Sequence, residues 1–254
     1  MKLNRLKLQE VKLHKKLAKS YYCVREKNPH YSYFNDFWID QIRTMLPKKK
    51  YQNTLDLGCG TVEFYELIKE KLHSNYLGVD LSSDMLEIGK KKYKNIHLLK
   101  ADAENLRIKK SSFDLIIGRG IIHHLPNPVK GCEEAYRVLK KGGYFIVSEP
   151  HSNFLLKLIR KVYYKISNHF SDAHKSFSEK ELLNLLIESG FVIEKVGFYG
   201  VLSFPFAFPD ILPTYKFMTF PIFKLLVKLD EVIVEIPFLR KMAWHIIILC
   251  KKIK

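Results

Sequence analysis

The chain has 254 residues, enough for one α/β domain with a sizeable core and room for insertions, and 47% of its residues are hydrophobic. No uncharged apolar run approaches the roughly 20 residues that cross a bilayer, and the start, MKLNRLKLQEVKLHKKL, is too charged for a secretory signal. The four cysteines, Cys23, Cys59, Cys132 and Cys250, show neither paired nor metal-binding spacing, which indicates a reduced, cytoplasmic protein.

The net charge of +17 is concentrated near the N-terminus. Residues 1–50 hold 13 Lys or Arg against 4 Asp or Glu, a net +9, so more than half of the excess precedes the expected domain at 51–254. Two interpretations stay open: attraction to an anionic polymer or membrane surface, or solubility alone. Residues 1–20 are expected to form a basic helix, which could be a surface helix or an interfacial anchor, and an aromatic stretch follows at 21–38.

Apolar runs and helical patterns alternate between residues 51 and 199. They predict strands near 53–58, 75–80, 96–101, 113–118 and 143–149, and helices near 61–73, 82–93 and 128–140. Such alternation is typical of a parallel sheet with helices on both faces. Ligands of such sheets bind beyond the carboxyl ends of the strands.

The pattern changes after residue 150, where two insertions are expected, at about 151–177 and 201–240. The first contains a basic amphipathic helix at 154–166. A capped helix at 178–189 and strands at 191–199 and 243–250 lie around the second. The second insertion is rich in Phe, Leu and Pro and has to bury itself. Three placements stay open: over the sheet edge, over an acceptor site, or on a membrane.

The stretch TLDLGCGTVEF, residues 54–64, reads as a strand, a glycine turn and the start of a helix. Glycines in such a turn let the backbone approach a ligand, and a helix start offers unpaired N–H groups. Asp80 ends the next apolar run, twenty residues after Gly60, a spacing that suits the two hydroxyls of a ribose. The sequence therefore predicts a nucleoside site at this turn.

Four motifs in one order, LDLGCG, GVD, ADAENL and FDLIIGRGIIHHL, resemble the class I S-adenosylmethionine-dependent methyltransferases, in particular the small-molecule group of type 11. The resemblance covers roughly residues 51–199. It implies a Rossmann-like, seven-stranded, mostly parallel sheet with an antiparallel last strand, helices on both faces, a helical lid at 1–50 and the apolar insertion before the last strand. One departure is Val62, which stands where the family usually has a third glycine.

The resemblance implies S-adenosyl-L-methionine as the cofactor and S-adenosyl-L-homocysteine as its product. Within the cofactor site it implies contacts of Asp102 and Ala103 with the adenine and of Gly118 and Arg119 with the methionine part, while the lid makes Tyr21 a candidate contact. The implied cofactor-binding residues are Tyr21, Asp56, Gly58, Cys59, Gly60, Asp80, Leu81, Asp102, Ala103, Gly118 and Arg119. No metal site is expected.

Methyl transfer from a sulfonium is an in-line displacement, which needs positioning and, for some acceptors, a general base. His123 and His124 follow the fourth strand and are the catalytic candidates; either can orient or deprotonate the acceptor, or be structural. Glu149, His151 and His174 are secondary candidates.

Glu149-Pro150 and the apolar insertion resemble enzymes of lipid, glycolipid or polysaccharide pathways, so the sequence favours O- or N-methylation of a small or lipid-linked acceptor, with peripheral membrane contact. An RNA or tRNA methyltransferase is a first alternative because of the +17 charge, although basic residues mixed with aliphatic ones, and the missing Asn-Pro-Pro-Tyr motif, disfavour nucleic acid. A non-catalytic binding protein is a second alternative because of Val62. Glu63 occupies the last position of a GxGxxG pattern, which disfavours a dinucleotide. The sequence makes no prediction of oligomeric state.

Overall fold

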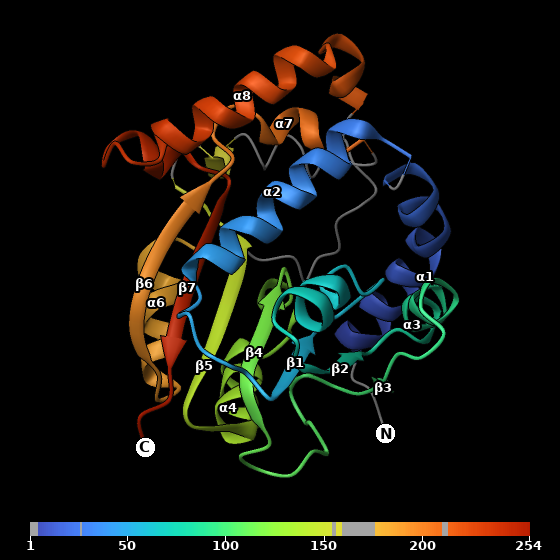
Figure 1. The fold of residues 1–254 in the computed structure, drawn as a ribbon, viewed down its shortest axis with the longest axis vertical. Coiled ribbons are helices and arrows are strands. Elements are labelled where there is room, and N and C mark those ends of the chain that lie inside the picture. Colours follow the sequence, from blue (N-terminus) through green and yellow to red (C-terminus); the bar gives the residue numbers. More distant parts are fainter. Residues whose placement is uncertain (1–4, 26, 154–155, 159–175, 210–212) are drawn as a thin grey trace.

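In a computed structural model of the chain, residues 5–25, 27–153, 156–158, 176–209 and 213–254 are described (Figure 1). Their centre is one seven-stranded sheet in the order β3-β2-β1-β4-β5-β7-β6. The strands are β1 (Asn53–Leu57), β2 (Asn75–Asp80), β3 (Leu98–Lys100), β4 (Phe113–Arg119), β5 (Leu139–Pro150), β6 (Val192–Tyr199) and β7 (His245–Lys251).

The sheet is parallel except for β7, which pairs antiparallel with β5 on one side and β6 on the other. Four of the five residues of β1 and most of β4 and β7 are buried, as expected for strands covered on both faces. The Rossmann-like sheet with an antiparallel last strand is therefore confirmed.

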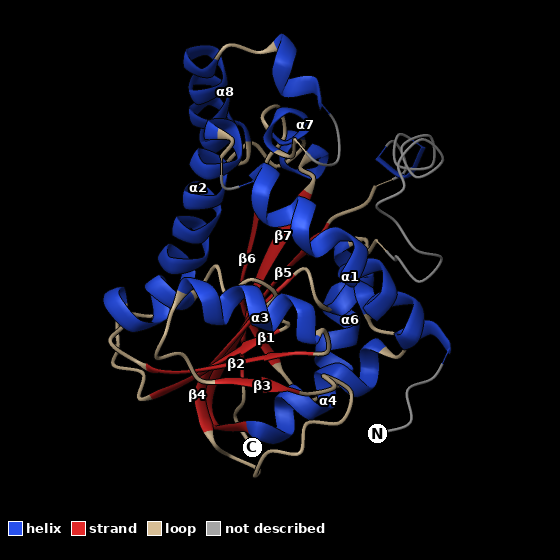
Figure 2. Ribbon diagram, turned by 90° about the vertical axis from the view of Figure 1, so that its right-hand side faces the viewer, coloured by secondary structure: helices blue, strands red, loops and turns tan. Residues whose placement is uncertain are grey.

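Helices cover both faces of this sheet, with one hydrophobic cluster under each layer (Figure 2). On one face lie α4 (Pro128–Val138) and α6 (Glu179–Glu188), which bury Ala135 and Leu186 among others. On the other face, α2 (Pro29–Met45) packs with residues near η1 (Leu67–Lys71) and with Leu86 of α3 (Ser83–Lys92). All the parallel strands therefore end at one edge between two apolar layers.

The segment after β1 differs from the expected helix over 61–73. Residues 61–64 form turns, a short helical stretch follows, and η1 is a π-helix. Val62 adopts the left-handed conformation with φ of 64° and is fully buried. A left-handed residue cannot continue a right-handed helix, so the prediction of a regular helix from residue 61 is wrong.

The N-terminal residues form α1 (Arg5–Arg25) and α2. The residue pattern predicted a helix over 1–20 and the resemblance a helical lid over 1–50, without a separate start for α2. The side chain of Asn28 caps α2 by accepting from the backbone N–H groups of His30 and Tyr31, and Pro29 occupies its first turn. Asn followed by Pro is a typical helix start that the sequence did contain. In Figure 1, α2 runs diagonally in front of the upper part of the sheet, and α1 descends beside α3.

The second insertion forms α7 (Phe204–Ala207), η3 (Pro213–Phe217), α8 (Phe220–Ile233) and η4 (Leu239–Met242). It packs on α2: Phe208 contacts the rings of Tyr31, Phe34 and Trp38, and Phe223 contacts His30. None of the described residues of this insertion lines the cavity of the candidate site. Most of the first insertion, including the predicted helix at 154–166 apart from 156–158, lies outside the described residues, as does His174.

Candidate functional site

The turn after β1 brings backbone N–H groups to a carboxylate at the end of β2. The Gly60 N–H donates to one oxygen of Asp80 at 2.9 Å, and the Ser82 N–H donates to the other at 2.8 Å. Gly58 and Gly60 both have positive φ, of 70° and 50°. These glycines supply a conformation that other residues rarely adopt, and so hold the turn against Asp80. Each carboxylate oxygen accepts only one of these bonds and has a further lone pair for a ligand hydroxyl.

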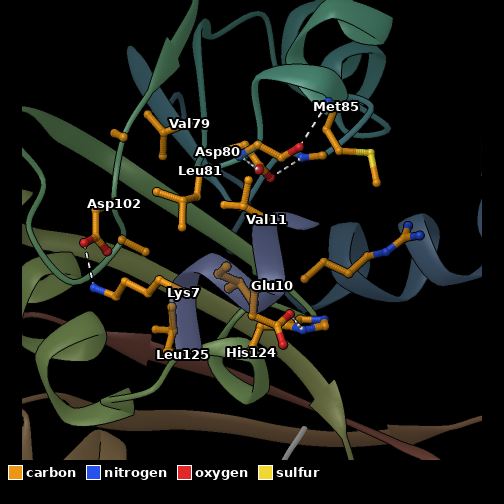
Figure 3. Close-up of a pocket in the computed structure, with 18 of the residues that line it drawn as sticks. Lys7, Glu10, Val11, Val79, Asp80, Leu81, Met85, Asp102, His124 and Leu125 are labelled. Carbon is orange, nitrogen blue, oxygen red and sulfur yellow. Dashed lines mark hydrogen bonds and ion pairs between the residues drawn. The ribbon is translucent and has the colours of Figure 1, made fainter. Parts of the chain in front are cut away.

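A cavity opens beside this turn, at the carboxyl ends of β1, β2 and β4 (Figure 3). A Cβ built on Gly60 would meet nothing within 4 Å, so the turn leaves open space on that side. The cavity is lined by Lys7, Glu10, Val11, Gly58, Gly60, Thr61, Val79, Asp80, Leu81, Ser82, Met85, Ala101, Asp102, Ala103, Arg119, Gly120, Ile121, His124, Leu125 and Pro126. The carboxylates of Asp80 and Asp102, the glycine turn and the apolar walls together suit the nucleoside that the sequence predicts.

Helix α1 closes one side of the cavity. Its Lys7 ammonium lies 2.6 Å from a carboxylate oxygen of Asp102 and 2.6 Å from one of Glu104, and all three side chains are at least nine-tenths buried. Burial lowers the pKa of Lys7, but these two carboxylates outweigh it and raise that pKa. Lys7 and Glu10 were missed from the sequence because a contact such as Lys7 to Asp102 joins residues 95 positions apart.

Arg119, at the end of β4, is held by side chains of α2 and of the turn after β1. Its guanidinium donates to Glu63 and, at 2.6 Å, to the side-chain oxygen of Asn35, and it lies 4.0 Å above the centre of the Trp38 ring. Burial would raise the pKa of Glu63, but Arg119 and the hydroxyl of Tyr31 hold it below its usual value. The ion pair is therefore formed at neutral pH, and it fixes a cationic side chain of the cavity at the end of β4.

The two histidines of the motif after β4 face different partners. The His123 ring is buried, with its Nδ1 2.7 Å from Glu149, and it does not line the cavity. The His124 ring does line the cavity, with its Nδ1 2.9 Å from the carboxylate of Glu10. In Figure 3, Glu10 and Val11 lie between Asp80 and His124. Of the two rings, therefore, His124 lines the cavity, whereas His123 is turned to the buried Glu149.

Glu149, at the end of β5, organises the turn that carries both rings. Its fully buried carboxylate accepts backbone N–H bonds from Ile121, Ile122 and His123 and lies against the His123 ring. Burial raises the pKa of Glu149 to about 7, although the three backbone donors oppose that shift. The carboxylate acts inside the protein and does not reach the cavity.

The structure brings most of the predicted site residues together. Eight line the cavity: Gly58, Gly60, Asp80, Leu81, Asp102, Ala103, Arg119 and His124. Cys59 and Gly118 lie beside the cavity without lining it. Asp56 is buried behind the turn, where it accepts from the Tyr76 hydroxyl at 2.9 Å. Burial raises the pKa of Asp56 to about 7. His151 is buried against the carbonyl of Ala243. The side chain of Tyr21 is outside the described part of the structure.

Among the described residues there is no cluster of three or more His, Cys, Asp or Glu that could hold a metal.

Comparison with known proteins gives one matching family model, described as a methyltransferase domain, over residues 55–147. A demethylmenaquinone methyltransferase of Staphylococcus haemolyticus is 33% identical over 136 residues, 50% of this chain and 56% of that protein. A malonyl-[acyl-carrier protein] O-methyltransferase of Marinomonas is 30% identical over 138 residues, 53% of this chain and 51% of that protein. The chain thus spans about half the length of these two relatives.

A third relative is matched over more of its length. The demethylmenaquinone methyltransferase of Staphylococcus saprophyticus is 30% identical over 183 residues, 63% of this chain and 78% of that protein. Among solved structures, a methyltransferase of Thermotoga maritima superposes with a TM-score of 0.63 at 24% identity, over 94% of this chain and 98% of that one. At that identity the superposition shows a shared fold alone.

Proposed function

Because the chain belongs to the class I S-adenosylmethionine-dependent methyltransferases, whose cofactor is S-adenosylmethionine, we propose that it transfers a methyl group from this cofactor to a small or lipid-linked acceptor. One observation carries the proposal: the turn at Gly58 and Gly60, the Asp80 carboxylate and the His124 ring all line one cavity. The cofactor supplies an activated methyl group, and the chain supplies its placement.

The residues of the cavity suit the cofactor part by part. Asp80 offers two carboxylate oxygens to the ribose hydroxyls, and backbone groups of Gly58 and Gly60 approach closely because these residues have no side chain. Asp102, whose charge is neutralised by Lys7, is proposed to accept from the adenine amino group. Arg119 offers a positive charge for the cofactor's carboxylate, while Glu63 and Asn35 hold its guanidinium in place.

His124 is proposed to act on the acceptor. The carboxylate of Glu10 at its Nδ1 selects the tautomer in which this nitrogen carries the proton. The Nε2 atom is then the ring nitrogen that can take a proton from an acceptor oxygen or nitrogen. His123 is proposed to be a positioning residue, because its ring is turned to the buried Glu149.

Two features support an amphiphilic acceptor and a peripheral place at a membrane. Glu149-Pro150 and the apolar insertion at 201–240 are the sequence features that favour lipid pathways. Relatives at 33% and 30% identity are named for demethylmenaquinone and for malonyl-acyl carrier protein. No helix of the described residues is long and apolar enough to cross a bilayer. An acceptor delivered at a bilayer surface would then be taken up by a protein that binds that surface from one side.

Calorimetry and a turnover assay test the proposal in turn. We expect S-adenosylmethionine and S-adenosylhomocysteine to bind with measurable heat. We also expect S-adenosylhomocysteine to accumulate when a prenylated quinol or phenol, a glycolipid or a soluble analogue is added. The absence of heat at millimolar cofactor would contradict the proposal in favour of a non-catalytic binding protein. Turnover with RNA but with none of these acceptors would contradict it in favour of an RNA methyltransferase.

The role of His124 is tested in the same assay. His124→Asn should lower the turnover number about 10²-fold or more if the ring removes a proton, with the heat of cofactor binding unchanged. His97→Asn, in an exposed loop before β3, is the matched control and should leave turnover unchanged. An unchanged turnover number in His124→Asn would contradict the assignment.

A further inference from the structure

Helix α8 exposes an apolar stripe on the side facing away from the protein. Its members recur every three or four residues and so lie along one face of the helix. Large fractions of their side chains are in contact with solvent, 55% at Leu225 and 64% at Val232. The outer stripe consists of Ile222, Leu225, Leu229 and Val232, and the exposed Ile236 follows it three residues after the end of α8.

The opposite face of α8 is anchored in the protein. Phe223 and Val227 are buried in the same hydrophobic cluster as Phe34 and Trp38 of α2. The buried carboxylate of Asp230 accepts the backbone N–H groups of residues 202 and 203, which fastens the helix to the start of the insertion. The outer stripe is therefore not needed for the core, and leaving it in water costs free energy that only a partner would recover.

Two exposed phenylalanines lie beyond the ends of this stripe. Phe217, in η3, is 87% exposed, and Phe238, after α8, is 78% exposed. Five basic residues are distributed through 213–242, against two acidic residues that are exposed. Apolar side chains with surrounding positive charge match a surface that has an apolar interior and anionic head groups.

The outer stripe also lies on the functional side of the molecule. β6 and β5 both run antiparallel to β7, so they are parallel to each other, and the insertion leaves β6 at the edge where the parallel strands end. The cavity opens at that same edge. Helix α2 joins the two: its His30 contacts Phe223 of α8, and its Asn35 accepts from Arg119 of the cavity. Figure 1 shows α8 above α2 and beyond the sheet.

We propose that the outer face of α8, with Phe217 and Phe238, docks on an anionic lipid bilayer and so holds the cavity near its surface. This docking extends the proposed function, because it would bring the cavity to a lipid-linked acceptor, and it rests on that function. The docking itself can be measured without an acceptor. The other occupant of such a face would be a second copy of the chain. A stable interface takes roughly 20–30 residues from each partner, far more than this stripe provides.

Vesicle co-sedimentation of the full chain tests the docking. Wild-type protein is mixed with vesicles of phosphatidylglycerol and phosphatidylcholine, with vesicles of phosphatidylcholine alone, and with the first kind at high salt. The stripe variant carries Leu225→Gln and Val232→Gln. The control carries Ile187→Gln and Val129→Gln, two exposed apolar residues on α6 and α4. Phe238→Ser, outside any helix, is a second variant that does not depend on the stability of α8.

We expect wild type and control to bind the anionic vesicles. The stripe variant and Phe238→Ser should bind them with an affinity lower by about tenfold or more. Binding should fall in high salt and on phosphatidylcholine alone. Equal binding of wild type and both variants, or no binding of wild type, would overturn the proposal. So would a wild-type dimer in light scattering that the stripe variant loses, without vesicle binding.

Calorimetry with S-adenosylmethionine on the same samples separates this proposal from the proposed function. Heat of cofactor binding without vesicle binding overturns the docking alone. Vesicle binding without that heat supports the docking and contradicts the methyltransferase activity.

Discussion

The sheet edge that carries the candidate cavity and the cover formed by α2, α7 and α8 are held together by different interactions. At the edge, the turn at Gly58 and Gly60 uses backbone N–H groups, and the side chains that matter are carboxylates such as Asp80. In the cover, aromatic rings pack on one another, with Phe208 against Phe34 and Phe204 against Trp244. Hydrogen bonds to a carboxylate act locally and directionally, whereas ring packing has many interchangeable partners.

The contrast shows why the edge with the cavity depends on single residues, whereas the cover depends on the sum of many ring contacts. Arg119 is where the two halves meet, because its ion pair to Glu63 belongs to the edge and its contact with Trp38 belongs to the cover. Substitutions in the edge should change binding more than stability. Substitutions in the cover should do the opposite.

The largest effect is expected from Phe208→Ala in the cover. Phe208 is 6% exposed and contacts four neighbouring rings, so its removal should lower the free energy of unfolding by about 3–5 kcal/mol. Chemical denaturation measures this. Phe217→Ala, at an 87% exposed position, is the matched control and should change stability by less than about 0.5 kcal/mol. Equal losses in the two variants would contradict the role given to the cover.

Asp80→Asn in the edge should have the next largest effect, on binding. The amide keeps one acceptor oxygen but replaces the other with a donor, so the affinity for S-adenosylmethionine should fall about 30- to 100-fold in calorimetry. Stability should change far less than in Phe208→Ala. Glu87→Gln removes the same charge from an exposed position of α3 and should leave affinity unchanged. An unchanged affinity in Asp80→Asn would show that Asp80 does not hold the ribose.

The same contrast explains what could be predicted from the sequence. The positions of the strands along the chain, the glycine turn and Asp80 follow from local patterns, because turns and strand ends are determined by neighbouring residues. The antiparallel last strand was implied by the resemblance to the family. The closure of the cavity by Lys7 and Glu10 depends on tertiary contacts across the chain and left no local pattern. Helix α2 had a usable signal in Asn28-Pro29, which the aromatic composition around it obscured.

Glu149→Gln tests how much the buried carboxylate of Glu149 stabilises the turn that carries His123 and His124. At pH 5 the wild-type carboxyl carries a proton, and its hydroxyl can donate to the His123 ring while its oxygens accept from the three backbone N–H groups. The amide places an NH2 group, which cannot accept, against the same donors, so at pH 5 the variant should be less stable by about 1–2 kcal/mol. Glu188→Gln, on the exposed end of α6, should change nothing.

The stability difference between wild type and Glu149→Gln should depend on pH, in a direction set by the raised pKa of Glu149. Burial raises the pKa of Glu149 to about 7, so between about pH 4.5 and 7 the folded state holds a proton that the unfolded state releases. Wild-type stability from this group is therefore present at acid pH and lost as pH rises to 7, and the variant has no such loss. The stability advantage of wild type over the variant at pH 5 should therefore shrink as pH rises and reverse in sign by about pH 7 in denaturation curves. A difference that widens with pH would mean that the fold favours the ionised form.

The smallest effect is expected at Val62, where the chain departs from the glycine of its family. A valine at φ of 64° is strained by about 1–2 kcal/mol, yet its side chain is fully buried against Gly89, whose absent Cβ would lie 2.8 Å from it. Strain and packing therefore oppose each other at this position. Val62→Ala removes most of the packing and keeps the strain, whereas Val62→Gly removes both.

Comparing these two variants isolates the strain. We expect Val62→Gly to be more stable than Val62→Ala by about 1 kcal/mol, the reverse of the usual order for these residues away from left-handed positions. Because Val62 does not line the cavity, the affinity for S-adenosylmethionine should change by less than about threefold in either variant. If Val62→Ala is the more stable of the two, the turn is not left-handed in solution, and the interruption of the helix after β1 needs another cause.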